Sequence, residues 1–268
     1  MAKTVDFPSE LRHFVKVLNS FRGYWYDYDI FRDFIDYTTA SLLWEGDKEL
    51  ADRFKRTYKD DYPRFGEMFL ALVETMRDQI ADDSGWYDAL GELYEAISSR
   101  SKASFLGQFF TPPEVCDLMA KMQVPEVKPA GKTVNDPACG SGRLLLAFNS
   151  VAPANYLIGQ DMDAICTKMT AINMALHGCT GQALNGDSLR PDHFAFGYEV
   201  NSMIHITQGL PHLLPISREQ SVAYQIWHNK KGEPVPVPQS LSIPDAEPLP
   251  LQKIAKRQLE PGVQLSIF

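Results

Sequence analysis

The chain has 268 residues, of which 44% are hydrophobic and 22% charged, and its formal net charge is −8. This composition is typical of a globular protein, and the net charge argues against binding nucleic acid through a general excess of Lys and Arg. No apolar run approaches the ~18 residues of a membrane span. The four cysteines form no CxxC pair, which argues against a zinc site or a disulfide framework. We therefore expect a cytoplasmic protein with no bound metal and no membrane contact.

Residues 8 to about 100 carry apolar residues at three- and four-residue spacing, as in DIFRDFIDYTTASLLW. This period is typical of helices that bury one face. We expect a helical N-terminal domain over residues 1–100. Its aromatic residues Tyr24, Trp25, Tyr26 and Tyr28 could stack on nucleic-acid bases, but a helical core and its rim explain them more simply.

Residues 101–210 alternate between strand and helix patterns, which predicts βαβ units and a parallel sheet in an α/β fold. Thr111 is a predicted N-cap, with Pro112 at the first helical position, and Gly178 is a predicted helix end. The expected strands are 133–138, 155–163 and 182–189, and the expected helices are 111–122, 142–151 and 164–178.

The last zone, residues 211–268, contains 9 of the 18 prolines, and its segment EPVPVPQSLSIPDAEPLP favours an extended backbone. We expect a proline-rich tail without a further βαβ unit. This zone holds 6 Lys/Arg against 5 Asp/Glu, so the acidic excess lies in the first 200 residues. Contact with DNA would have to come from a local patch, from this tail or from a partner protein.

The sequence DPACGSG, residues 136–142, stands where a strand ends and a helix begins. Gly140 and Gly142 permit a positive φ and let a ligand lie directly on the backbone. A Walker loop would need GxxxxGK[ST], which is absent, and a dinucleotide fingerprint would need glycine where Leu145 stands. The remaining candidate is S-adenosyl-L-methionine, whose single carboxylate needs less of an anion cradle than a pyrophosphate does.

Acidic residues follow the next two strands. Asp161 lies 21 residues beyond Gly140, the usual interval to a carboxylate that binds ribose at such a turn. Asp161 could instead cap the following helix, but Asp163 fits that role better. Asp187 ends the third strand, where an adenine amino group would lie.

DPACGSGRLL resembles the cofactor loop of N6-adenine DNA methyltransferases, specifically the modification subunits of type I restriction systems. The resemblance covers about residues 88–190 and includes DALGELYEAISS, GQFFTPPEVCDLM, GQDMD, INMALHG and GDSL. It implies a Rossmann-like S-adenosylmethionine-dependent methyltransferase fold and DNA as a partner. By the family pattern, Gln108, Phe109 and Thr111 would contact the methionine moiety. Asp136, Cys139, Gly140 and Gly142 would line the cofactor loop. Asp161 would bind ribose, Met162 would pack on adenine, and Asp187 would bind the adenine amino group.

The family's catalytic motif, Asn/Asp-Pro-Pro-Tyr/Phe, does not occur in this sequence. Its Asn side chain and a prolyl carbonyl accept hydrogen bonds from the target amine, while the aromatic residue stacks on the flipped base. Asn201 falls near the expected position, but without the prolines and the aromatic it is a weak catalytic candidate. Two interpretations stay open: an adenine-N6 methyltransferase with an atypical or partner-completed active site, and a catalytically silent cofactor-binding protein that acts by interaction.

The last five residues, QLSIF, resemble the peptide by which bacterial proteins bind the DNA polymerase sliding clamp. Gln264 would supply an amide, and Leu265, Ile267 and Phe268 would fill an apolar groove. The segment follows a proline-rich stretch, which keeps it extended and accessible. The simpler alternative is that these apolar residues pack into the core of the protein itself.

Overall fold

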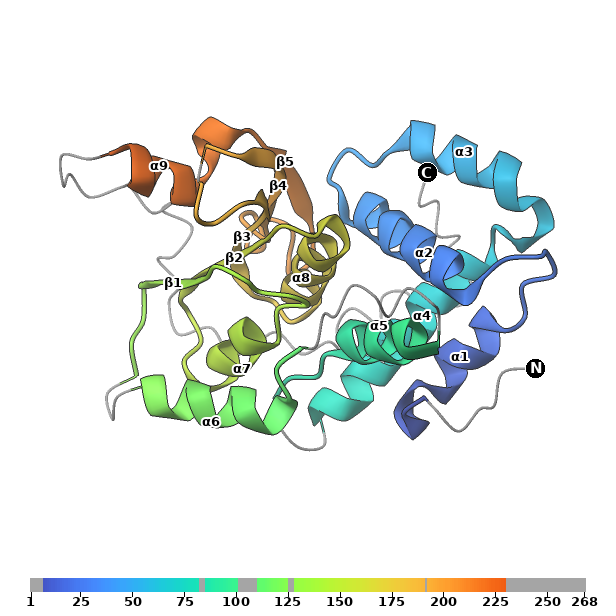
Figure 1. Ribbon diagram of the computed structural model, residues 1–268, viewed down its shortest axis with the longest axis horizontal. Helices are drawn as coiled ribbons and strands as arrows, with labels where there is room; N and C mark the ends of the chain where they lie inside the picture. The colour runs from blue at the N-terminus through green and yellow to red at the C-terminus, as the bar shows by residue number, and fades with distance from the viewer. Residues whose placement is uncertain (1–6, 82–84, 101–109, 125–127, 191, 230–268) are drawn as a thin grey trace.

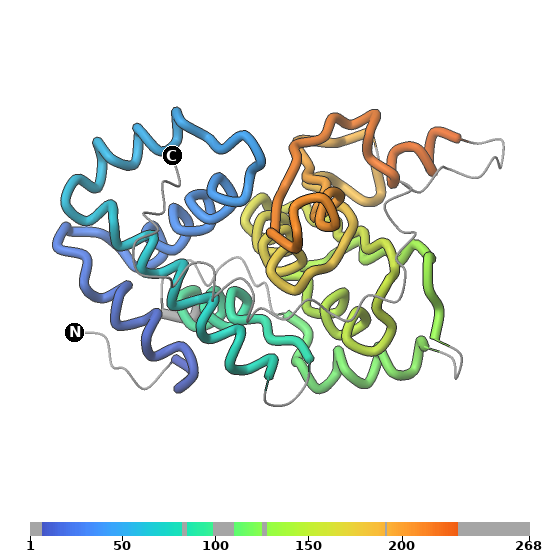
Figure 2. The backbone as a smooth tube through the Cα atoms, turned by 180° about the vertical axis from the view of Figure 1, so that it is seen from behind, coloured from blue at the N-terminus to red at the C-terminus, as the bar shows by residue number. Residues whose placement is uncertain are grey.

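The computed structural model describes residues 7–81, 85–100, 110–124, 128–190 and 192–229. Figure 1 shows the N-terminal helices grouped beside a five-stranded sheet and its own helices. Figure 2 shows the same two groups from behind. The predicted positions Gln108 and Phe109, and the C-terminal peptide Gln264–Phe268, lie outside the described residues.

Helices form where the apolar spacing predicted them. In α2, the residues Ile30, Phe31, Phe34 and Ile35 are all buried, as an amphipathic helix requires. The N-terminal helices are α1 (Arg12–Leu18), α2 (Asp27–Leu42), α3 (Lys48–Tyr58), α4 (Arg64–Gln79) and α5 (Ala89–Arg100), with short 3-10 helices at Ser9–Leu11 and Lys59–Asp61.

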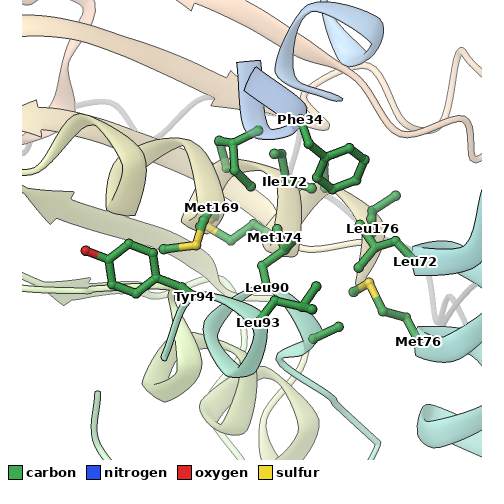
Figure 3. Packing of buried hydrophobic residues seen from close by; sticks show 14 of the residues in the cluster. Phe34, Leu72, Met76, Leu90, Leu93, Tyr94, Met169, Ile172, Met174 and Leu176 are labelled. Atoms are coloured by element: carbon green, nitrogen blue, oxygen red, sulfur yellow. The ribbon is translucent and has the colours of Figure 1, made fainter. Parts of the chain in front are cut away.

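The hydrophobic core continues from these helices into the sheet-containing part. Figure 3 shows Phe34 of α2, Leu72 of α4 and Leu90 of α5 around Ile172 and Leu176 of helix α8 (Ala164–Leu176). These five side chains belong to one cluster of buried residues. The predicted boundary near residue 100 therefore does not coincide with a gap in the core.

The sheet is mixed, with the strand order β1-β2-β3-β4-β5. The first three strands are parallel to one another. Strand β4 pairs with β3 in antiparallel orientation, and β5 pairs with β4, again antiparallel. The strands are β1 (Thr133–Asp136), β2 (Tyr156–Asp161), β3 (Thr180–Gly186), β4 (Phe194–Val200) and β5 (Leu213–Ile216). Helix α7 (Arg143–Val151) connects β1 to β2, and α8 connects β2 to β3. The predicted α/β class and the βαβ units are confirmed.

Three details differ from the expectation. Helix α6 (Pro113–Gln123) begins one residue later than predicted, because Pro112 is extended (ψ 143°) and forms the N-cap in place of Thr111. The antiparallel strand β4 has no counterpart in the predicted elements. Strand β5, a 3-10 helix at Arg218–Gln220 and helix α9 (Val222–His228) lie inside the predicted tail, because the chain folds back to pair with β4 before its proline-rich part begins.

No described helix is long and apolar enough to cross a membrane. Within the described part of the chain, no group of three or more His, Cys, Asp or Glu side chains could hold a metal ion.

The end of α8 contains a histidine that the fold holds neutral. His177 Nδ1 lies 2.7 Å from the Asn173 carbonyl oxygen, and Nε2 accepts a hydrogen bond of 3.2 Å from the Tyr87 backbone N–H. Burial lowers the pKa of His177 from 6.5 to about 4. Since the unfolded chain binds this proton more readily, the contribution of His177 to stability falls as pH drops below about 6.5.

We therefore expect the stability difference between the wild type and His177→Gln to depend on pH. Urea unfolding should show a wild-type advantage that is about 1–2 kcal/mol smaller at pH 5 than at pH 7. Because both proteins contain the same carboxylates, the effect of carboxylate titration on the free energy of unfolding cancels when the two are compared. An advantage of equal size at both pH values would show that His177 is not held neutral.

Candidate cofactor site

The turn between β1 and α7 has the backbone conformation that its glycines predicted. Gly140 has a φ of 55° and Gly142 a φ of 91°, values that side chains with a Cβ atom rarely adopt. The Gly142 N–H donates to the Cys139 carbonyl oxygen over 2.8 Å, and the Cys139 N–H donates to that of Gln160 over 3.0 Å. The turn is thus fixed to the end of β2, the next strand.

An aromatic ring lies against this turn. A Cβ atom on Gly140 would come within 2.7 Å of Phe110 Cδ1, so glycine is required here for packing as well as for backbone conformation. The Phe110 N–H donates to Glu95 Oε1 over 3.1 Å, and the Arg143 guanidinium lies 5.4 Å from the centre of the Phe110 ring. Thr111 is exposed, and its carbonyl oxygen accepts a 3.4 Å hydrogen bond from Arg143.

The two acidic residues at the end of β2, Asp161 and Asp163, have different roles, and Asp163 caps the next helix as predicted. Asp163 is the N-cap of α8, and its side chain accepts from the Ile165 N–H over 2.7 Å. Asp161 instead faces the glycine turn, where its Oδ2 accepts from the Gly140 N–H over 2.9 Å and its Oδ1 accepts from the Asp163 N–H over 2.8 Å. The structure therefore brings Asp161 and Gly140 into direct contact.

The other predicted residues follow the same ends of the parallel strands. Asp136 ends β1, and burial and the nearby charge of Asp161 raise its pKa. Cys139 is buried, and its Sγ lies 3.3 Å from Thr170 Oγ1. Because burial raises the pKa of this thiol, it is held protonated and unreactive.

Met162 and Asp187 complete this edge of the sheet. Met162, directly after β2, is 71% exposed. Asp187 directly follows β3, and its Oδ1 accepts from the Leu189 N–H over 2.9 Å. The carboxyl ends of β1, β2 and β3 thus present acidic residues and one exposed apolar side chain.

Asn201 lies at the other end of the sheet. It follows β4, whose last residue Val200 pairs with Gly181 near the start of β3. Gly181 is about 17 Å from the last residue of that strand. The Asn201 side chain is fully buried, donates to the Ala175 and Cys179 carbonyl oxygens and accepts from the His212 N–H. The antiparallel direction of β4 thus separates Asn201 from the glycine turn. The Asn201 amide group is already engaged in buried hydrogen bonds with the backbone.

Asn201→Ala is accordingly expected to change stability. Removing three buried hydrogen bonds at a residue with a φ of 55° should lower the free energy of unfolding by about 2–4 kcal/mol. Cofactor affinity, measured by calorimetry at a temperature where the variant is folded, should stay within twofold of the wild type. A variant of unchanged stability would instead show that these hydrogen bonds do not stabilise the fold.

The structure adds a buried network that residue patterns did not indicate. Asp88 is 3% exposed and accepts hydrogen bonds from Ser141 Oγ, Arg143 Nε (2.6 Å) and Asn173 Nδ2 (2.7 Å). Arg143 also pairs with Glu95 through Nη2 at 2.8 Å. Asp88 lies directly before α5, where it also accepts from the Gly91 N–H as a helix cap would. The capping pattern was readable in the sequence, but the contact with the glycine turn was not.

The charges around the turn restrict what it can bind. The Asp161 carboxylate occupies the Gly140 N–H, and Arg143 is buried and paired with two carboxylates. A pyrophosphate at this turn would meet negative charge without a free cation from these residues. A ligand with hydroxyl and amino groups and a positive charge, as in S-adenosyl-L-methionine, fits the acidic residues better.

The N-6 DNA methylase family model matches residues 86–211, a segment that contains the whole network and every described residue of the site. The matched segment begins at Trp86, two residues before Asp88, so it includes both α5 and the glycine turn that Asp88 contacts.

Proteins similar to this segment are named as methylase subunits of type I restriction enzymes. The MjaVIII methylase subunit of Methanocaldococcus jannaschii is 33% identical over 124 residues, which are 42% of this chain and 21% of that protein. The MpnII methylase subunit of Mycoplasma pneumoniae is 30% identical over 133 residues, 45% of this chain and 24% of that protein. The chain thus spans less than a quarter of the length of these relatives. A type I restriction-modification methyltransferase subunit from Streptococcus thermophilus superposes with a TM-score of 0.33 at 19% identity, over 63% of this chain and 55% of that chain.

Proposed function

We propose that the chain binds S-adenosyl-L-methionine at the Gly140 turn and serves adenine-N6 methylation of DNA as a cofactor-binding component. The observation that carries this proposal is the contact between the Asp161 carboxylate and the Gly140 N–H, within the segment that the N-6 DNA methylase family model matches. The family resemblance and the acidic edge of the sheet support the same ligand.

Each part of the cofactor has a matching group in the chain. Asp161 is the acceptor for ribose hydroxyl groups, Asp187 for the adenine amino group, and Met162 offers an apolar surface to the adenine ring. Gln108, Phe109 and Thr111 would hold the methionine end. When bound, the cofactor supplies an electrophilic methyl group.

A thermal unfolding series tests the choice of ligand. S-adenosyl-L-methionine and S-adenosyl-L-homocysteine, each at 1 mM (about tenfold above a dissociation constant near 100 µM), should raise Tm by a few degrees. NAD and ATP at the same concentration should not, because the Asp161 carboxylate repels phosphate groups. Stabilisation by NAD or ATP alone would contradict the proposal.

Transfer of the methyl group to DNA is proposed to need a partner. The sequence has no Asn-Pro-Pro-aromatic motif, and Asn201 is buried at the far end of β3. The isolated chain should therefore transfer labelled methyl groups to duplex DNA poorly or not at all. Repeating the assay with added bacterial cell extract tests whether a partner protein completes the active site. Robust transfer to adenine by the purified chain alone would contradict this part.

A second candidate function rests on the C-terminal sequence QLSIF, which resembles a sliding-clamp-binding peptide. A clamp contact would bring an acidic chain to DNA that its own charge does not attract. Biolayer interferometry with a purified bacterial clamp should show a dissociation constant on the order of micromolar, as is typical of a short peptide with few anchors. The double variant Leu265→Ala/Phe268→Ala should lose binding. Equal binding by both proteins, or none by either, would reject the clamp contact.

A further inference from the structure

Helix α6 is apolar on its outward face as well as on its buried face. Cys116 and Ala120 are fully buried toward the protein. The opposite face carries four exposed apolar side chains at i, i+3, i+4 and i+7 spacing, which puts them on one side of the helix. These are Val115 (42% exposed), Leu118 (58%), Met119 (37%) and Met122 (77%), here called the α6 stripe.

A surface helix normally turns charged and polar residues toward water. Figure 1 shows α6 on the outside of the molecule, beside α7. Contiguous exposed apolar side chains of this kind mark interaction sites more often than isolated ones do. The α6 stripe therefore has the character of an interaction surface.

The charges that flank the stripe point to that occupant. Glu114 and Lys121 are both exposed and lie seven residues apart, on the same flank of the stripe. In a two-fold contact every surface meets its own copy in the reverse direction. Two α6 helices packed antiparallel would set Glu114 of each copy near Lys121 of the other, and so form two opposite-charge pairs beside an apolar seam.

We propose that the α6 stripe is a self-association surface, on which α6 of a second copy of this chain packs antiparallel. The helix has 11 residues and so is about 16 Å long. This small contact gives a weak dimer, with a dissociation constant on the order of 10–100 µM. The proposal stands independently of the proposed function.

Charge-reversal variants test both the occupant and its direction by sedimentation equilibrium of the full chain. Glu114→Lys and Lys121→Glu should each weaken self-association about tenfold or more, since each turns two attractive pairs into repulsive ones. An equimolar mixture of these two variants should associate again as a heterodimer. The double variant Glu114→Lys/Lys121→Glu should regain the wild-type constant as a homodimer.

Leu118→Asp provides a disruption that does not depend on the charge pairs. It should leave the circular dichroism spectrum unchanged, because Leu118 is exposed, and abolish dimer formation. A wild-type chain that stays monomeric at several hundred micromolar would overturn the proposal. So would a dimer that survives Leu118→Asp, or charge variants whose mixture associates no better than each variant alone.

Discussion

Replacing Asp88 by alanine is expected to lower the free energy of unfolding by about 3–5 kcal/mol, the usual cost of removing one partner from a buried ion pair. Asp88 and Arg143 are only 3% and 4% exposed, and Asp88 also accepts from Ser141 and Asn173. Without Asp88, three side-chain donors and the Gly91 N–H lose this acceptor, and the start of α5 separates from the glycine turn. Equilibrium unfolding in urea measures the loss.

Asp33→Ala is the matched control for Asp88→Ala. The Asp33 carboxylate also accepts from a side-chain hydroxyl, that of Tyr58 at 2.7 Å, and pairs with an arginine, Arg32. Since Arg32 is half-exposed, we expect a loss of no more than about 1 kcal/mol. A loss below 1 kcal/mol for Asp88→Ala as well would mean that the buried network does not hold the turn.

Asp161→Ala is expected to weaken S-adenosyl-L-methionine binding by about 1.5–3 kcal/mol, or roughly 10- to 150-fold. The carboxylate accepts from the Gly140 N–H and is the acceptor that we assign to ribose. The variant therefore loses a contact that shapes the turn and a contact with the ligand. Isothermal titration calorimetry measures the change in the dissociation constant.

Asp163→Ala separates ligand binding from helix capping. Asp163 caps α8 two residues further on, so this variant should cost about 1 kcal/mol of stability while cofactor affinity stays within threefold of the wild type. Equal loss of affinity in both variants would place the effect in the α8 terminus and not in the Asp161 carboxylate.

The sequence predicted those parts of the site that depend on local chemistry. Gly140 and Gly142 occur where the backbone has a positive φ, which glycine adopts most readily, and the helix-capping role of Asp163 follows from its place before an apolar helix. The alternation of strands and helices likewise follows from periodicity within each segment. Each of these features involves residues close together along the chain.

Contacts between distant segments were beyond the reach of such patterns. Asp88 and Arg143 are 55 residues apart, and nothing in either segment specifies the other as a partner. The direction of β4 depends on which sheet edge it joins, and that choice moves Asn201 to the far end of β3. The strand β5 pairs with β4 although it precedes a proline-rich stretch, so composition alone extended the predicted tail too far.

The central claim is that the glycine turn and the acids beside it bind S-adenosyl-L-methionine. Isothermal titration of the cofactor into the purified chain tests it most directly, with S-adenosyl-L-homocysteine as a second ligand and Asp161→Ala as the site variant. We predict one binding site per chain and a marked loss of affinity in the variant. Absence of any binding heat for both ligands at millimolar concentration, with the chain shown to be folded, would contradict the account.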